Sequence, residues 1–195
     1  MKRIFDILGA IVVLAPVVLL TVWIGFLVVL INRYRPFFFQ IRPGKAGKNF
    51  VCLKINTLRP AKNESEINDK EKDKLRATKF GTWLRNRGLD ELPQVMNILV
   101  GHMSFVGPRP LLEKNYAKIS FENPTMSEDI LKWRNLREKV RPGLSGWHQI
   151  HSLNSGIIRY DLEYLGKPTL RKHLEAISKS FLIMVIGKNR YFKVQ

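Results

Sequence analysis

Two adjacent carboxylates, Asp90 and Glu91, are the residues of this sequence best suited to chemistry. Neighbouring helix positions do not share a face, so the two side chains should point apart and perform different tasks. One can attack a substrate while the other orients it. Carboxylates also bind Mg²⁺, which bridges to substrate phosphates. The pair by itself leaves a second interpretation open, because an aspartate at a helix start is commonly a simple N-cap.

Two arginines in proline-containing turns supply positive charge for phosphate chemistry. Arg109 lies between two prolines, and Arg141 begins a second proline-glycine turn, so the two turns could face one pocket. Arginine binds phosphate with two parallel hydrogen bonds, and a rigid turn reduces the entropy lost in holding it. The predicted phosphate-binding residues and structural loop of the site are Arg109, Arg141, Lys54, Gly107, Pro108 and Pro110.

Other catalytic patterns are missing from the sequence. It has no Walker loop, no Gly-x-Gly-x-x-Gly and no nucleophile elbow, so triphosphate hydrolysis and serine hydrolase chemistry lack support. His148 and His151 lack a third metal ligand and are interpreted as loop histidines. Cys52 is the only cysteine, which excludes an intrachain disulfide, and we expect it in the core.

The composition is strongly basic. The 195 residues include 33 Lys and Arg against 16 Asp and Glu, which gives a net charge of +17. This length suits one domain with an attached membrane element. Such a charge favours anionic partners, and by itself it does not separate nucleic acid, anionic lipid and phosphorylated substrates.

A membrane segment is predicted at the N-terminus. No charged residue occurs from Ile7 to Ile31, which exceeds the roughly 20 residues of a spanning helix. Both flanks are basic, whereas a spanning helix usually has one basic flank, and Pro16 should bend the helix at a break within the membrane. We predict a membrane-embedded re-entrant helix over 1–35 and a cytoplasmic catalytic domain over 36–195. A single kinked span is the alternative.

The elements that must position the acidic pair follow from apolar spacing. Alternating residues in 50–55 predict a short strand, which forms a hairpin with the aromatic segment 36–40. Charges of both signs predict a mobile charged loop, or an exposed helix, near 59–79. An amphipathic helix is predicted over 75–87, with Gly88 as its stop.

A second helix is predicted to begin near Asp90 and to end at Gly101. Its predicted core stripe consists of Leu92, Val95, Met96 and Leu99. A further helix over 126–140 should lead into an irregular loop over 141–147.

The last predicted helix has an apolar face with basic residues beside it. That face consists of Leu170, Leu174, Ile177, Phe181 and Val185. It suits either an ordinary core helix or an amphipathic helix in the lipid interface, and the neighbouring membrane segment favours the second. The predicted fold class is α+β: a mostly helical small domain with a short β-hairpin, an N-terminal re-entrant membrane helix and interfacial amphipathic helices.

Short motifs in a fixed order extend over nearly the whole chain. They are Lys2-Arg3-Ile4-Phe5-Asp6, Phe38-x-Gln40-x-Arg42-x-Gly44, Leu89-Asp90-Glu91-Leu92-Pro93-Gln94, Asn97, Met103-Ser104-Phe105-Val106-Gly107-Pro108-Arg109-Pro110 and Arg141-Pro142-Gly143-Leu144-Ser145-Gly146-Trp147. Their order and spacing resemble the bacterial sugar transferase family, specifically the small monotopic phosphoglycosyl transferases that begin bacterial glycan assembly.

This resemblance implies a two-step reaction. The Asp of the Asp-Glu pair attacks the β-phosphate of a UDP-sugar, releases UMP and carries the phosphosugar, which undecaprenyl phosphate then accepts. On this sequence Asp90 would be nucleophile and Mg²⁺ ligand, Glu91 would assist the metal or the lipid phosphate, and Arg109 would bind phosphate. Mg²⁺ is therefore the expected cofactor.

The resemblance also implies a location. The expected site is the bacterial inner (cytoplasmic) membrane, with the catalytic domain facing the cytoplasm and lying on anionic lipid of the inner leaflet. The product would start a lipid-linked glycan for O-antigen, capsule, exopolysaccharide or protein glycosylation. Downstream glycosyltransferases are compatible further partners, and no nucleic-acid partner is expected.

The sequence departs from the family pattern at several positions. Asn56 replaces a basic residue within Lys54–Leu58, His102 replaces the usual Asp, and Gly88 replaces a common Ser. The membrane break is Ala15-Pro16 instead of Ser-Pro. These departures leave the sugar open.

A second hypothesis belongs to a different class. A membrane-tethered basic binding module, for nucleic acid or a glycan-assembly partner, would explain the charge without catalysis. It does not explain the acidic pair beside the Arg109 turn.

Overall fold

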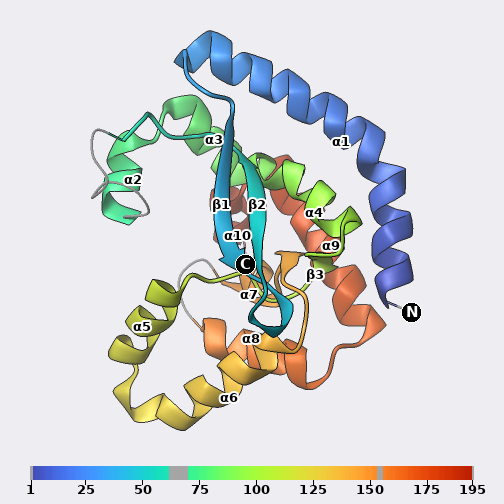
Figure 1. Cartoon of the computed structure of the whole chain (residues 1–195), viewed down its shortest axis with the longest axis vertical. Coiled ribbons are helices and arrows are strands. Elements are labelled where there is room, and N and C mark those ends of the chain that lie inside the picture. The colour runs from blue at the N-terminus through green and yellow to red at the C-terminus, as the bar shows by residue number, and fades with distance from the viewer. Residues whose placement is uncertain (1, 62–69, 153–155, 195) are drawn as a thin grey trace.

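The computed structural model describes residues 2–61, 70–152 and 156–194 and confirms the α+β fold. A long helix arches over one side of a central β-hairpin, and shorter helices surround the remainder (Figure 1). The strands are β1 (Phe37–Pro43), β2 (Asn49–Ile55), β3 (Ser104–Val106) and β4 (Gly143–Ser145). The helices are α1 (Lys2–Asn32), α2 (Lys70–Arg76), α3 (Lys79–Arg87), α4 (Val95–Leu99), α5 (Glu113–Glu122), α6 (Ser127–Glu138), α7 (Trp147–His151), α8 (Ile157–Gly166), α9 (Leu170–Ile186) and α10 (Lys188–Val194), with 3₁₀ helices η1 (Lys45–Gly47), η3 (Leu89–Gln94) and η4 (Pro124–Met126).

Helix α1 contains the apolar segment and, by length and composition, can cross a membrane. Pro16 lies near its middle, where the missing N–H and the bulk of the ring favour a bend. Figure 1 shows the helix changing direction along its course. Many of its large apolar side chains are exposed, as a lipid-facing surface requires.

The start of α1 is bound to the rest of the protein by polar side chains. Arg3 donates to the last two carbonyls of α4 at 2.5 and 2.8 Å, which satisfies groups that a helix end leaves free. Asp6 accepts hydrogen bonds from the Ser104 hydroxyl and the next backbone N–H, both at 3.0 Å. Lys2 donates to the carbonyl that ends β3 at 2.7 Å.

The second half of α1 packs into an apolar core. Ile24 and Val28 are buried in one cluster with Ile55, Leu84 and Leu89, which come from β2, α3 and η3. Both halves of α1 therefore contact the same domain.

Strands β1 and β2 pair antiparallel along their full length, which confirms the predicted hairpin. Because side chains alternate along a strand, Phe50 and Cys52 face the core together, and the buried Cys52 is confirmed there. The Asn97 amide of α4 fastens the hairpin, since it donates to Val51 O at 2.8 Å and accepts from Leu53 N–H at 3.4 Å.

The charged stretch near 59–79 is partly helical, because α2 occupies its second half. Residues 62–69 of this predicted loop lie outside the described residues. The helix predicted over 75–87 starts later than expected, at Lys79. The reason is a cap: Thr78 Oγ1 accepts the Gly81 N–H at 2.9 Å.

The acidic pair lies inside the 3₁₀ helix η3, so the N-cap interpretation of Asp90 is wrong. Gly88 precedes η3 with φ +70°, which also confirms the predicted stop of α3. A 3₁₀ helix has about three residues per turn, and this shifts the phase of the residues that follow. Met96, predicted for the core stripe, is therefore exposed, while Ile98 is buried.

Two glycines let the proline turns meet. Strands β3 and β4 pair in parallel, so the loop predicted over 141–147 contains a strand. A Cβ at Gly107 would lie 2.6 Å from the Arg141 carbonyl oxygen, and one at Gly143 would lie 2.1 Å from a backbone nitrogen. Only glycine permits this approach.

A buried ion pair joins α6 to α8 behind the Arg109 turn. Arg137 pairs with Asp161, and the Trp133 indole donates to the same carboxylate at 3.1 Å. Arg137 also donates to the Tyr116 hydroxyl at 3.1 Å and to the Arg109 carbonyl oxygen. Charges at this depth are tolerated only when paired and hydrogen-bonded.

Helix α9 leaves its predicted apolar face exposed, so the interpretation of that face as core is wrong. The exposed residues are Leu170, Leu174, Ile177, Phe181, Leu182 and Val185. Ala176 and Ile183 are buried instead. The histidines predicted to lie in a loop, His148 and His151, belong to α7.

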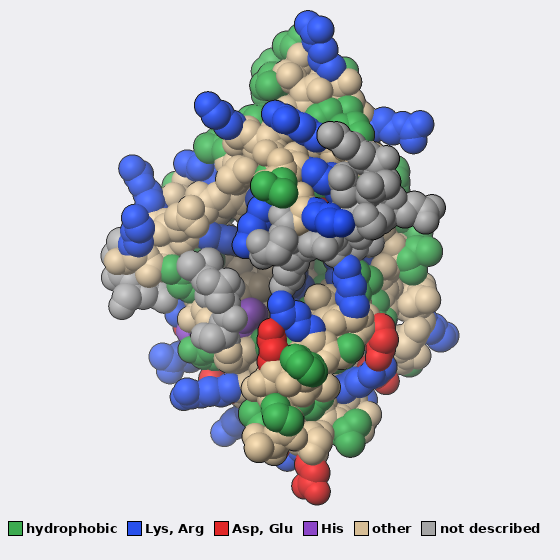
Figure 2. All heavy atoms as spheres, turned by 90° about the vertical axis from the view of Figure 1, so that its left-hand side faces the viewer, with side chains coloured by type: hydrophobic (Ala, Val, Ile, Leu, Met, Phe, Trp, Pro, Cys, Tyr) green, Lys and Arg blue, Asp and Glu red, His purple; other side chains and the backbone are tan. Residues whose placement is uncertain are grey.

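Basic side chains are distributed widely over the surface. On the face drawn in Figure 2, Lys and Arg side chains predominate over acidic ones and extend over several elements. This excess of basic side chains gives the face a general attraction for anions.

Replacing Asp161 with alanine tests the buried pair. The Arg137 guanidinium would lose its counter-charge, and we expect the free energy of unfolding to fall by about 3–5 kcal/mol. Urea unfolding in detergent, followed by tryptophan fluorescence, measures this. Glu113→Ala is the control, because it removes an exposed pair with Arg134 and should cost less than about 1 kcal/mol. Equal losses would contradict the role given to the buried pair.

Candidate active site

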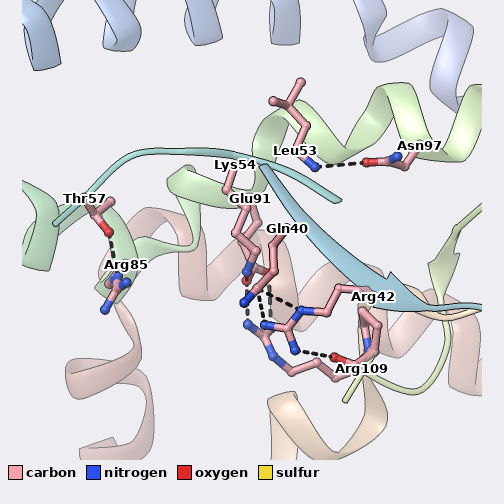
Figure 3. Close-up of polar contacts among 10 residues, drawn as sticks. Gln40, Arg42, Leu53, Lys54, Thr57, Arg85, Glu91, Asn97 and Arg109 are labelled. Atoms are coloured by element: carbon pink, nitrogen blue, oxygen red, sulfur yellow. Dashed lines mark hydrogen bonds and ion pairs between the residues drawn. The ribbon is translucent and has the colours of Figure 1, made fainter. Parts of the chain in front are cut away.

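Glu91 holds two cations that come from distant parts of the chain (Figure 3). Arg109 donates from Nη2 to Oε1 at 2.6 Å and from Nη1 to Oε2 at 3.2 Å, and Lys54 Nζ donates to Oε1 at 2.7 Å. The residue is only 9% exposed. Burial alone would raise the pKa of Glu91, but the charges of Arg109 and Lys54 outweigh it and hold that pKa well below its usual range.

Asp90 is equally buried, at 8% exposure, yet no described residue pairs or hydrogen-bonds with its carboxylate. Burial raises the pKa of Asp90, and the charge of Glu91 adds to this effect. Lys54, Lys188 and Arg85 act in the opposite direction without cancelling it. The two neighbouring carboxylates thus have different surroundings: Glu91 is committed to ion pairs, and Asp90 has no hydrogen-bond partner among the described residues.

Hydrogen bonds to three consecutive carbonyls fix the Arg109 turn. The Pro108 carbonyl accepts from the first N–H of β4 at 3.0 Å, and the Pro110 carbonyl accepts from Arg42 at 3.1 Å. The carbonyl between them accepts from Arg137. Because these hydrogen bonds and the two prolines restrict the backbone of the turn, the Arg109 side chain is held towards Glu91.

Five polar side chains at or beside the site were not among the predicted site residues: Gln40, Arg42, Thr57, Arg85 and Gln94. Arg42 donates from Nε to Gln40 Oε1 at 2.9 Å, and Arg85 donates to Thr57 Oγ1 at 2.7 Å (Figure 3). Gln94 lines the same small cavity as Glu91, since positions three apart share one side of a 3₁₀ helix. The family motifs contain all of these except Arg85, for which we find no sequence signal.

Arg141 lies apart from the cluster. Its Nε donates to the Gly101 carbonyl oxygen at 2.7 Å, just beyond the end of α4. The structure therefore brings Lys54 and Arg109 to the acidic pair and does not bring Arg141 there. The predicted loop residues do meet beside the site, because Gly107 packs on the backbone of β4.

The acidic pair offers Mg²⁺ one available carboxylate. Both oxygens of Glu91 accept hydrogen bonds from cations, whereas Asp90 has no described partner. Residues 2–61, 70–152 and 156–194 contain no group of three or more His, Cys, Asp or Glu side chains suited to a metal. Mg²⁺ often uses one or two carboxylates and completes its shell with water and substrate phosphates, so the donor set fits a metal that arrives with the substrate.

Similar proteins are sugar transferases and exopolysaccharide proteins. The chain is 35% identical over 159 residues to the uncharacterized sugar transferase EpsL of Bacillus subtilis (strain 168), covering 80% of this chain and 70% of EpsL. It is 30% identical over 209 residues to the exopolysaccharide production protein ExoY of Sinorhizobium fredii (strain NBRC 101917 / NGR234), covering 97% and 88%.

A longer relative carries a named activity. The chain is 33% identical over 144 residues to the UDP-glucose:undecaprenyl-phosphate glucose-1-phosphate transferase of Xanthomonas campestris pv. campestris. That match covers 69% of this chain but only 28% of the relative.

The family model gives the broadest match. It is described as bacterial sugar transferase, and it matches residues 1–187. The match includes α1, the acidic pair and the Arg109 turn. This chain therefore belongs to the bacterial sugar transferase family.

Proposed function

We propose that this protein transfers a sugar-1-phosphate from a UDP-sugar to undecaprenyl phosphate through a covalent intermediate on Asp90. The observation that carries the proposal is the contrast between two buried neighbouring carboxylates. Glu91 is committed to Arg109 and Lys54, while Asp90 has no described partner. A buried carboxylate without a partner is costly, and perturbed groups of this kind concentrate at reacting centres.

In the first step an oxygen of Asp90 attacks the β-phosphorus of the UDP-sugar. A new O–P bond forms, the bridging P–O bond to the α-phosphate breaks, and UMP leaves with the electron pair. The product is a mixed anhydride of the Asp90 carboxyl group and the sugar phosphate. Arg109, held by its turn, binds phosphate oxygens on which negative charge accumulates.

In the second step a phosphate oxygen of undecaprenyl phosphate attacks the same phosphorus. The bond to Asp90 breaks, the carboxylate is restored, and the sugar is left on a lipid diphosphate. Splitting one displacement into two lets a single site serve two anionic substrates in turn. Glu91 orients Arg109 in both steps, and Lys54 helps to hold the Glu91 carboxylate in place.

Mg²⁺ is the proposed cofactor. When bound, it neutralises negative charge on the diphosphate and on the departing UMP. Asp90 would hold the ion directly with one oxygen, and Glu91 would support it from the neighbouring position.

Contacts at both ends of α1 support a re-entrant membrane segment. Arg3 and Asp6 bind one end to the domain, and Ile24 and Val28 pack the other end against it. A straight crossing would carry one end to the opposite side of the bilayer, away from its partners. We therefore propose that both ends of 1–35 face the cytoplasm of the bacterial inner membrane, with the exposed face of α9 in the interface.

The names of relatives suggest which substrate to test first. Several are named for UDP-glucose and undecaprenyl phosphate, and others for exopolysaccharide production. We propose UDP-glucose as the first donor, with exopolysaccharide assembly as the first pathway and its later glycosyltransferases as users of the product. Departures at Asn56 and His102 make other UDP-sugars necessary in the panel.

A membrane-tethered basic module without catalysis is the second candidate. The net charge of +17 favours it. It gives no reason for keeping Asp90 buried without a partner beside a fixed arginine. Purified protein that releases no UMP from any UDP-sugar, with Mg²⁺ and undecaprenyl phosphate present, would favour this candidate.

Asp90→Asn tests the nucleophile. We expect turnover to fall by at least about 10³-fold and the phosphosugar adduct to disappear, because an amide does not form the mixed anhydride. UMP release and intact mass measure the two effects. Asp129→Asn, an exposed change on α6, should leave both unaffected. An adduct that persists in the Asp90 variant would refute the assigned role.

Removal of divalent cations tests the cofactor. We expect EDTA to abolish UMP release and added Mg²⁺ to restore it, because the diphosphate charge is then no longer neutralised. The unfolding midpoint should be measured in the same samples, to show that the protein stays folded. Full activity in EDTA would rule out a required metal.

A cysteine tag at Met1, in a Cys52→Ser background, tests the topology. We expect an impermeant maleimide to label the tag only after spheroplasts are lysed, because both ends of α1 bind the same domain. Lys48→Cys, exposed in the hairpin turn, reports the domain in the same background. Labelling of the tag in intact spheroplasts would exclude the re-entrant model.

A further inference from the structure

Lys188 is the first residue of α10 and follows directly after the segment that the family model matches. Two contacts fix this helix. Asn86 Oδ1 of α3 accepts the Asn189 N–H at 3.0 Å, and the buried Tyr191 donates its hydroxyl to the Ile150 carbonyl at 3.2 Å. The backbone of Lys188 is therefore held beside the end of α3.

The end of α3, to which α10 is bound, leads directly into the 3₁₀ helix that contains the acidic pair. Asn86 lies four residues before Asp90, at the end of the helix that leads into η3. The charge of Lys188 acts on Asp90, Glu91 and Arg109. The lysine is half-buried although it pairs with no acidic side chain among the described residues.

The other cations of the site already have partners. Lys54 and Arg109 bind Glu91. Arg42 binds Gln40 and the Pro110 carbonyl, and Arg85 binds Thr57. Among the cations near the acidic pair in the part of the chain that the structure describes, Lys188 is the one whose ammonium group is not committed.

The charge balance indicates what Lys188 could bind. The cations Arg42, Lys54, Arg85, Arg109 and Lys188 surround two carboxylates, so positive charge exceeds negative charge at the site. Burial, the largest effect, lowers the pKa of Lys188, which shows that its charge is poorly solvated there. An anionic ligand would supply the missing counter-charge. A solvated lysine with a buried stem is the plain alternative.

We propose that Lys188 binds a phosphate group of the substrates that react at Asp90. This inference rests on the proposed function, and it adds a substrate-binding residue contributed by α10. The phosphate belongs either to the nucleotide-sugar diphosphate or to the lipid monophosphate, and both present the same oxygen chemistry to an ammonium group.

Lys188→Met and Lys188→Arg test the proposal, with Arg190→Met as the matched control. Arg190 is exposed one helical position beyond Asn189 and belongs to no part of the site. We expect Lys188→Met to raise the KM for the UDP-sugar, for undecaprenyl phosphate, or for both, by about 10- to 100-fold, as loss of a charged hydrogen bond does. Lys188→Arg should recover part of the loss. The two KM values show which phosphate is bound.

A binding measurement separates this proposal from the reaction itself. Calorimetry with inorganic pyrophosphate in detergent should show weaker binding, by a similar factor, in Lys188→Met and unchanged binding in Arg190→Met. Suppose that Lys188→Met binds pyrophosphate more weakly than the wild-type protein, and that the wild-type protein itself releases no UMP. The Lys188 proposal would then be upheld and the transferase proposal refuted. If pyrophosphate affinity and both KM values stay within about twofold in Lys188→Met, or Arg190→Met shows equal losses, the Lys188 proposal is overturned. Unfolding midpoints show whether each variant is folded. If Lys188→Met is not folded, Lys188→Gln takes its place.

Discussion

The ion-pair cluster at Glu91 is the interaction on which the site depends. A buried ionised carboxylate is unfavourable unless opposite charges and hydrogen bonds compensate it, and Lys54 and Arg109 provide both. The three residues come from β2, η3 and the turn after β3. Three segments far apart in the sequence are thereby tied to one another. Asp90 differs from its neighbour because Glu91 holds Lys54 and Arg109, whereas the Asp90 carboxylate has no hydrogen-bond partner among the described residues.

The remaining structure makes that cluster rigid. The carbonyls of Pro108, Arg109 and Pro110 all accept hydrogen bonds. The donor to the Arg109 carbonyl is Arg137, which is itself paired with Asp161. The close approach of Gly107 to β4 sets the other side of the turn. An arginine held in this way would lose little conformational entropy on binding a phosphate group. The turn therefore preorganises Arg109 for binding.

The membrane segment and the site share the same supporting elements. Lys2 and Asp6 bind β3, which leads directly into the Arg109 turn, and Arg3 binds the end of α4, which continues from η3. The position of α1 and that of the acidic pair are therefore linked, because the elements that α1 binds lead directly into the site. The proposed reaction would need such a link, because a nucleotide sugar and a lipid phosphate come from different phases.

The sequence by itself determined the local features. Pro16 within an apolar run, the alternation in β2 and the helix stop at Gly88 depend on a few neighbouring residues, so pattern and propensity were sufficient. Tertiary structure alone decided which side chains meet. It placed Arg141 at the end of α4, left Met96 exposed and brought Lys188 towards the acidic pair. These outcomes depend on how whole elements pack, and no short stretch of residues encodes the distance between two elements.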